Sequence, residues 1–201
     1  DWNGWTKLET KKVDTGLLGD KEFTDAIGNK TTYLRDPASD KVLGVTHPDG
    51  STETNTFNSF LQPLTKIDRL GRQTAWTYDV AGNLLTKTVA VGTPDAATQS
   101  WTYWTATDVD AERGKPGQMK TSADARGNVT EYFYYPTGFV KRVVEPADIP
   151  TVARAMRNFI WDAAGRMQSS TDGAGRLTTY LYEPCNRLTR ATYLDTSYEE
   201  W

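Results

Sequence analysis

The sequence predicts an all-β fold, an antiparallel meander of β-hairpins. Three observations support this prediction: a recurring turn motif, strands in which threonine and aromatic residues alternate after the turn, and an even spacing between copies. The motif is Asp-x-x-Gly followed by Asn or Arg. Its six copies begin and end at Asp25 and Gly28, Asp68 and Gly71, Asp79 and Gly82, Asp124 and Gly127, Asp162 and Gly165, and Asp172 and Gly175.

Each copy of the motif predicts a hairpin tip. Aspartate at the first position of a type I turn accepts hydrogen bonds from backbone N–H groups ahead of it, and glycine at the fourth position adopts positive φ without strain. Such a turn followed by a left-handed residue is a common hairpin connection with a bulge. Three degenerate copies, which keep either the glycine or an acid, lie at residues 47–50, 135–138 and 183–187.

Alternating side chains after the glycines predict the strands. The sets are Thr31, Tyr33 and Arg35; Thr74, Trp76 and Tyr78; Thr130, Tyr132 and Tyr134; and Thr178, Tyr180 and Tyr182. Period-two alternation places each set on one face of a strand, and Thr, Tyr and Trp are good strand formers. The step is eleven residues from Gly71 to Gly82, from Gly127 to Gly138 and from Gly175 to Asn186, which fits one strand plus one turn.

The array is expected to span residues 1–201 without an internal domain boundary. Longer loops are expected at residues 91–98, 106–117 and 145–151, which are rich in Gly, Pro, Asp or Ala. Residues 151–160 could hold one helical turn but are expected to lead into a strand at 158–161. Neither end shows the polar cap of a finished repeat array, so the chain is expected to be a section of a larger one.

Composition narrows the possible partners. The chain is 37% hydrophobic with a mean hydropathy of −0.62, and aromatic residues make up 11%, so apolar burial depends on aromatics. The net charge of −3 comes from interspersed acids and bases, which argues against nucleic acid as a partner. A single cysteine cannot form an intrachain disulfide. No apolar stretch reaches the roughly 18 residues that a membrane-spanning helix needs, and residues 1–5 lack the basic and apolar regions of a signal peptide.

Two segments carry a family resemblance. Residues 127–135, Gly-Asn-Val-Thr-Glu-Tyr-Phe-Tyr-Tyr, and residues 71–79, Gly-Arg-Gln-Thr-Ala-Trp-Thr-Tyr-Asp, closely resemble the YD repeat of RHS proteins. That family includes bacterial polymorphic toxins, insecticidal toxin-complex subunits and animal teneurins. The resemblance covers roughly residues 23–195 and implies that the hairpins form part of a curved, spiralling β-shell. In the bacterial toxins such a shell encloses a C-terminal toxic domain.

The resemblance also implies partners and a location. The expected partners are the remaining repeats of the same shell and an enclosed effector domain, and the expected location is secreted or at the cell surface. One feature of the bacterial family is missing, the Asp-Pro-x-Gly-Leu segment of self-cleavage. The nearest string, residues 36–39, lacks Gly-Leu, so no protease residues are assigned. Because a fragment of a shell exposes unpaired strand edges, the isolated chain is expected to self-associate.

No catalytic, cofactor or metal-binding residues are expected. The chain has one histidine and one cysteine, too few for a zinc site or for a catalytic triad with a histidine base. We therefore expect His47 to be a turn residue and Cys185 to be an inert thiol. Asp108, Asp110 and Glu112 alternate in an acidic loop of the kind that binds calcium, but their spacing does not match the EF-hand pattern, so a solvated loop is predicted. The recurring aspartates are explained by turn chemistry rather than by a catalytic carboxylate pair.

Two roles are open for the aromatic rows, which comprise Tyr33, Trp76, Tyr78, Tyr132, Tyr134, Tyr180 and Tyr182. Packing within the sheet is favoured, because cross-strand aromatic and threonine pairs are themselves stabilising. The alternative is a carbohydrate- or cell-surface-binding module, in which exposed Trp101, Tyr103 and Trp104 also take part. The arginines that follow the turns, Arg72, Arg166, Arg176 and Arg187, are expected to bond loop carbonyls or acids near the tips.

Overall fold

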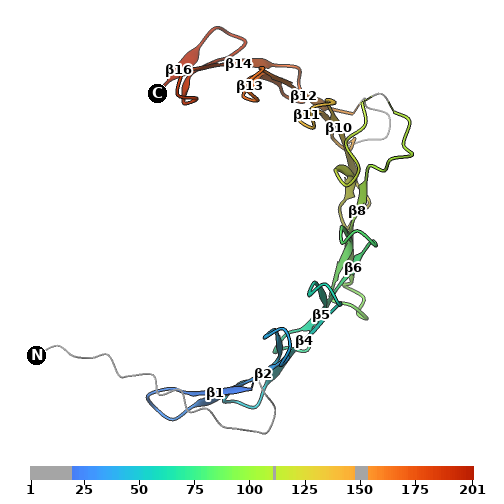
Figure 1. The fold of residues 1–201 in the computed structure, drawn as a ribbon, viewed down its shortest axis with the longest axis vertical. Helices are drawn as coiled ribbons and strands as arrows, with labels where there is room; N and C mark the ends of the chain where they lie inside the picture. Colours follow the sequence, from blue (N-terminus) through green and yellow to red (C-terminus); the bar gives the residue numbers. More distant parts are fainter. Residues whose placement is uncertain (1–19, 111, 148–153) are drawn as a thin grey trace, which may run out of the picture. The chain divides into compact units, whose positions relative to one another are not determined.

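The computed structural model describes residues 20–110, 112–147 and 154–201 (Figure 1). In these ranges the chain forms sixteen β-strands and no helix. It divides into two compact units, Asp1–Thr98 and Gln99–Trp201, with the division inside the strand β8.

In the first unit, consecutive strands pair antiparallel in sequence order. They are β1 (Lys21–Thr24), β2 (Lys30–Arg35), β3 (Val42–Thr46), β4 (Thr52–Phe57), β5 (Pro63–Ile67), β6 (Gln73–Tyr78) and β7 (Leu84–Val89).

The second unit repeats this arrangement from β8 onward, again with antiparallel pairing between consecutive strands. Its strands are β8 (Ala97–Tyr103), β9 (Met119–Ala123), β10 (Val129–Tyr134), β11 (Val140–Val144), β12 (Met156–Trp161), β13 (Met167–Thr171), β14 (Leu177–Tyr182), β15 (Leu188–Thr192) and β16 (Tyr198–Glu200).

A β-bulge marks every second hairpin, just before its tip. The register shifts before the last residue of β2, β4, β6, β8, β10, β12 and β14. That last residue is aromatic in all of these strands except β2, which ends in Arg35. A bulge leaves backbone groups unpaired in the ladder, so these positions need partners from elsewhere.

In the part of the chain that the structure describes, the sheet of each unit is a single layer, with no second sheet or helix against it (Figure 1). Among the described residues, the buried hydrophobic side chains are only Trp104, Tyr134, Val143 and Ala191, all in the second unit. Most strand side chains are half-buried against their neighbours on the same face. Stability must therefore come from contacts between adjacent hairpins rather than from one central core.

The predicted antiparallel meander is confirmed, with corrections to one loop and one strand. The loop expected at residues 91–98 is shorter, because β8 already begins at Ala97, and the strand expected at 158–161 begins earlier, at Met156. Residues 1–5, most of the segment 145–151 and the start of 151–160 lie outside the described residues. The single array without an internal boundary stays a prediction.

Candidate functional surface

The six predicted aspartates all sit at hairpin tips and make the same set of bonds. In each, Oδ1 accepts hydrogen bonds from the backbone N–H groups two and four residues ahead. At Asp124, for example, these donors are Arg126 N at 2.8 Å and Asn128 N at 2.9 Å. The glycines adopt left-handed φ, from 75° at Gly71 to 89° at Gly28.

The residue after each glycine closes the turn onto the aspartate. Asn29, Asn83 and Asn128 donate through Nδ2 to the other carboxylate oxygen, Oδ2, of Asp25, Asp79 and Asp124. Arg72, Arg166 and Arg176 donate through Nε to Asp68, Asp162 and Asp172, each at 2.7 Å. Arg187 pairs with Glu183 in the same way. The expectation that these arginines bond acids near the tips is confirmed.

These bonds lower the pKa values of the turn carboxyls. For Asp25, Asp68, Asp79 and Asp124 the largest cause is the hydrogen bond from the Asn or Arg side chain, followed by the backbone bond from the same residue. For Asp162 and Asp172 the backbone bond is the larger cause of the lowered pKa. The carboxylates are thus held ionised as turn acceptors.

The degenerate copies at His47, Tyr135 and Glu183 also form turns, closed by the bonds of their own backbone. Three further turns escaped the sequence pattern, at residues 36–41, 58–62 and 193–197. In them the left-handed position is occupied by Asp40, Leu61 and Thr196, with φ of 56°, 60° and 68°. In the 58–62 turn, Asn58 Oδ1 accepts from Phe60 N and Gln62 N as the aspartates do elsewhere.

The aromatic rows lie together on one face of each unit. In the first unit the aromatic face carries Tyr33, Trp76 and Tyr78, linked by the cross-strand pairs Tyr33–Val45, Val45–Glu53, Asn55–Lys66 and Lys66–Thr74. In the second unit it carries Tyr132, Tyr134, Tyr180 and Tyr182, linked by the pairs Tyr132–Val143, Val143–Arg157, Phe159–Ser170 and Ser170–Thr178. Directly paired residues point to the same face of a sheet.

Tyrosines on this face connect one bulged hairpin to the previous one. Tyr78, Tyr134 and Tyr182 donate their hydroxyl hydrogen to the carbonyl oxygens of Pro63, Met119 and Met167, each fifteen residues earlier, at 2.9–3.0 Å. The acceptors are the first residues of β5, β9 and β13. Trp161 Nε1 donates likewise to Val140 O at 2.7 Å, on the first residue of β11. Each bond satisfies a carbonyl beside a bulge and joins two hairpins.

A second set of bonds joins the tips of the same hairpins. Gln62 Nε2 donates to Gly82 O at 2.7 Å and Gln118 Nε2 to Gly138 O at 2.8 Å, each twenty residues ahead. Arg166 Nη1 donates to Asn186 Oδ1 with the same separation. These residues come immediately before β5, β9 and β13, so the tip bonds and the tyrosine bonds recur at the same hairpins.

Two other members of the aromatic rows, Tyr33 and Tyr180, contact side chains of neighbouring strands. Tyr33 makes an edge-to-face contact with Phe23, with ring centroids 5.4 Å apart. Tyr180 Oη lies 3.1 Å from Ser170 Oγ across the strands. On the opposite face of the first unit, threonine hydroxyls pair directly, Thr56 with Thr65 at 2.7 Å and Thr77 with Thr86 at 2.6 Å.

The loop between β8 and β9 corrects one expectation. Trp104 was expected to be exposed for carbohydrate binding, but it is only 4% exposed. Its Nε1 donates to Tyr132 O, and the Lys120 ammonium lies 4.6 Å from its ring centroid. A Cβ on Gly114 would come within 2.6 Å of the Trp104 ring, so the loop backbone packs directly on the indole.

Two of the three acids named for this loop, Asp108 and Glu112, pair with cations of the chain itself. Asp108 pairs with Lys120 at 2.5 Å, and Glu112 pairs with Lys141 at 2.6 Å and Arg142 at 2.9 Å. No group of three or more His, Cys, Asp or Glu side chains that could hold a metal ion occurs in the described ranges. His47 Nε2 lies 3.0 Å from Glu53 Oε1, and Cys185 is an exposed free thiol at a tip.

Within the part of the chain that the structure describes, no helix is long and apolar enough to cross a membrane.

Comparison with known proteins gives matches at the level of the repeat and of the fold. The family model named RHS Repeat matches residues 57–94 and 161–197. No curated protein matches the chain. The chain therefore contains RHS repeats at two places, one in each unit.

Solved toxin-complex structures share the fold. The structure of the Photorhabdus luminescens Tc holotoxin pore with the mutation TccC3-D651A aligns over 90% of this chain and 11% of its own, with 14% identity and a TM-score of 0.62. TcdB2-TccC3 without its hypervariable C-terminal region aligns over 92% of this chain and 12% of its own, also with 14% identity and a TM-score of 0.62. The chain thus spans about an eighth of the length of these proteins.

The tyrosine bond to the bulge predicts a measurable loss of stability. Replacing Tyr134 with Phe removes the donor to Met119 O and leaves that carbonyl without its partner, while the ring remains. The free energy of unfolding from urea titration should fall by about 1 kcal/mol. Tyr198→Phe is the control, because that residue is 57% exposed and its hydroxyl has no partner among the described residues. Equal stability of the two variants would contradict the assigned role.

The lowered pKa values of the turn carboxyls predict acid sensitivity. Their folded pKa values lie below the ordinary 3.8, so the folded chain binds fewer protons than the unfolded chain in acid. Their contribution to stability is complete above about pH 4 and is lost as the pH falls through the lowered folded pKa values. Asp49 and Asp108, which lie outside the six turns, act in the same direction, because hydrogen bonds lower the pKa of each to about 2. The urea midpoint should drop between pH 4 and pH 2.

In a variant with Asp124→Asn and Asp172→Asn, which keeps turn acceptors that do not titrate, the drop should be smaller. A midpoint independent of pH in this range would refute the explanation.

Proposed function

We propose that this chain, which contains RHS repeats, is a section of the wall of a curved β-shell that encloses or presents a separate effector domain. In this proposal its role is structural rather than catalytic, and the complete protein acts outside the cell or at its surface. The matched repeats and the fold shared with the toxin-complex structures support it.

One observation carries the proposal: neighbouring hairpins within each unit are bonded by side chains at recurring sequence separations. Tyrosine hydroxyls reach carbonyls fifteen residues back, and glutamine or arginine side chains reach tips twenty residues ahead. Within the described part of each unit, a strand contacts only the strands that directly precede and follow it in the sequence. An assembly of this kind extends by adding hairpins and needs no central core, which suits a thin wall.

A carbohydrate-binding module, the alternative function, receives less support. Trp104 is buried, and the hydroxyls of Tyr78, Tyr134 and Tyr182 are already bonded to carbonyls of the chain.

Electron cryomicroscopy of the complete natural polypeptide that includes this chain tests the proposal. We expect the sixteen strands to border a closed volume, with density for a further domain inside it. If both faces of the sheet border bulk solvent and no enclosed volume is present, the chain is not a shell wall.

The strand edges predict self-association of the isolated chain. In β16, Trp201 N donates to Thr189 O, so the alternate residue Glu200 directs its own N–H and carbonyl away from β15. An edge of this kind can pair with another chain. Sedimentation velocity should show oligomers, and Glu200→Pro, which removes the outward N–H, should reduce them. Glu200→Gln is the matched control, because it loses the ion pair with Arg190 but keeps the N–H. A compact monomer before any substitution would count against the prediction.

A further inference from the structure

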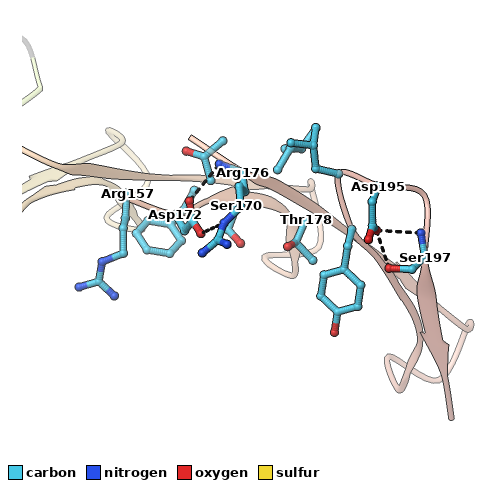
Figure 2. A pocket seen from close by; sticks show the side chains of 12 residues that line it. Arg157, Ser170, Asp172, Arg176, Thr178, Asp195 and Ser197 are labelled. Carbon is cyan, nitrogen blue, oxygen red and sulfur yellow. Dashed lines mark hydrogen bonds and ion pairs between the residues drawn. The ribbon is translucent and has the colours of Figure 1, made fainter. Parts of the chain in front are cut away.

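A groove on the aromatic face of the second unit runs from β12 to the end of β15 (Figure 2). Phe159, Ser170 and Thr178 line it in one cross-strand row, because Phe159 pairs with Ser170 and Ser170 with Thr178. Continuing the register of β14 and β15 by one residue places Tyr193, which also lines the groove, beside Thr178. The row therefore begins and ends with an aromatic side chain.

The sizes of these side chains define the shape of the groove. Ser170 and Thr178 are small and carry hydroxyl groups, so they form a low polar floor between the two aromatic residues. Adjacent strands lie about 4.8 Å apart, and three such steps separate Phe159 from Tyr193 by about 14 Å. The volume of the groove is about 680 Å³, within the range of ligand-binding clefts. The space is long enough for an extended ligand with more than one ring.

A second row, nearer the hairpin tips, carries charges of alternating sign. By register Arg157 lies beside Asp172 and Asp172 beside Arg176, and Asp195 lies at the following tip. All four residues line the groove, and two arginines with two aspartates give the lining no net charge. This balance disfavours a strongly acidic or strongly basic ligand, because neither sign of charge is in excess.

This charged row keeps both donors and acceptors that are not used by the fold. Arg157 bonds Glu145 through Nη2, and Arg176 bonds Asp172 through Nε. Asp195 accepts from Ser197 N and Ser197 Oγ through Oδ1 alone (Figure 2). The other guanidinium nitrogens and Asp195 Oδ2 have no bonded partner among the described residues. A ligand in the groove therefore meets unused donors and an unused acceptor along one rim.

We propose that this groove binds a neutral oligosaccharide. Each sugar hydroxyl both donates and accepts hydrogen bonds, so neighbouring hydroxyls can use the free guanidinium nitrogens and Asp195 Oδ2 together. The C–H groups of a sugar ring carry partial positive charge and pack on the electron-rich face of an aromatic ring, which Phe159 and Tyr193 supply. Trp104 and Tyr182, whose polar groups are engaged within the sheet, do not line this groove.

The site does not depend on the shell proposed above, since all its residues belong to the second unit. Failure of one proposal therefore leaves the other standing.

Saturation-transfer difference NMR on the complete 201-residue chain tests the site. The neutral probes are cellotetraose, maltotetraose and N-acetylchitotetraose, and we expect at least one of them to bind with transfer to its ring protons. The charged probes are tetragalacturonate, which is anionic, and fully deacetylated chitotetraose, which is cationic. Both should bind more weakly than the best neutral sugar, because the lining carries no net charge.

Two variants with matched controls locate the bound sugar. Tyr193→Leu removes the aromatic ring at one end of the groove and should weaken binding about fivefold. Tyr198→Leu, which changes an exposed tyrosine outside the groove, should leave the affinity unchanged. Asp195→Asn keeps an oxygen for the turn but replaces the unused carboxylate oxygen with an amide donor, and it should also weaken binding about fivefold. Asp49→Asn is its control, because Asp49 accepts from Ser51 N and Oγ in the same way in the first unit.

Urea midpoints of the four variants verify that each is folded before its affinity is compared. The proposal is overturned if none of the three neutral sugars binds, or if a charged probe binds more tightly than all of them. It is also overturned if Tyr193→Leu and Asp195→Asn bind the sugar as tightly as their controls do.

Discussion

The bond from an aromatic side chain to the carbonyl beside a bulge is the interaction on which the rest of the structure depends. A single-layer sheet buries few side chains completely, and here the buried hydrophobic residues among those described are Trp104, Tyr134, Val143 and Ala191. Backbone ladders join the strands, but each bulge interrupts the ladder and exposes polar groups. Tyr78, Tyr134, Trp161 and Tyr182 satisfy those groups and at the same time join one hairpin to the previous one.

Turn chemistry sets the position of these bonds. The aspartate that follows Tyr78 begins the next tip, where its Oδ1 accepts from Ala81 N and Asn83 N. Because the tip has a defined length and the left-handed Gly82 closes it, the next strand starts at a defined residue. A Tyr-Asp pair therefore links two functions in adjacent residues: tyrosine bonds the previous hairpin and aspartate folds the next.

The sequence predicted the parts of the fold that local chemistry determines. Asp-x-x-Gly specifies its turn through bonds between residues at most four apart, and alternation of Thr with aromatics defines a face. Three turns were missed because Asp40, Leu61 and Thr196 occupy left-handed positions without glycine, and only the surrounding hairpin holds them there. The partner of Tyr134 could not be predicted, because Met119 is brought to it by strand register and a bulge. The burial of Trp104 depends on a loop that packs back through Gly114, a contact with no local signal.

Native-state hydrogen exchange across low urea concentrations tests the central claim most directly, namely that neighbouring hairpins rather than a common core hold each unit together. If that is correct, amides of β1 in the first unit and β16 in the second should open at lower free energies than those of β5 and β6 or β13 and β14, which are bonded on both sides. A single opening free energy shared by every strand of a unit would contradict the claim and would indicate one cooperative core.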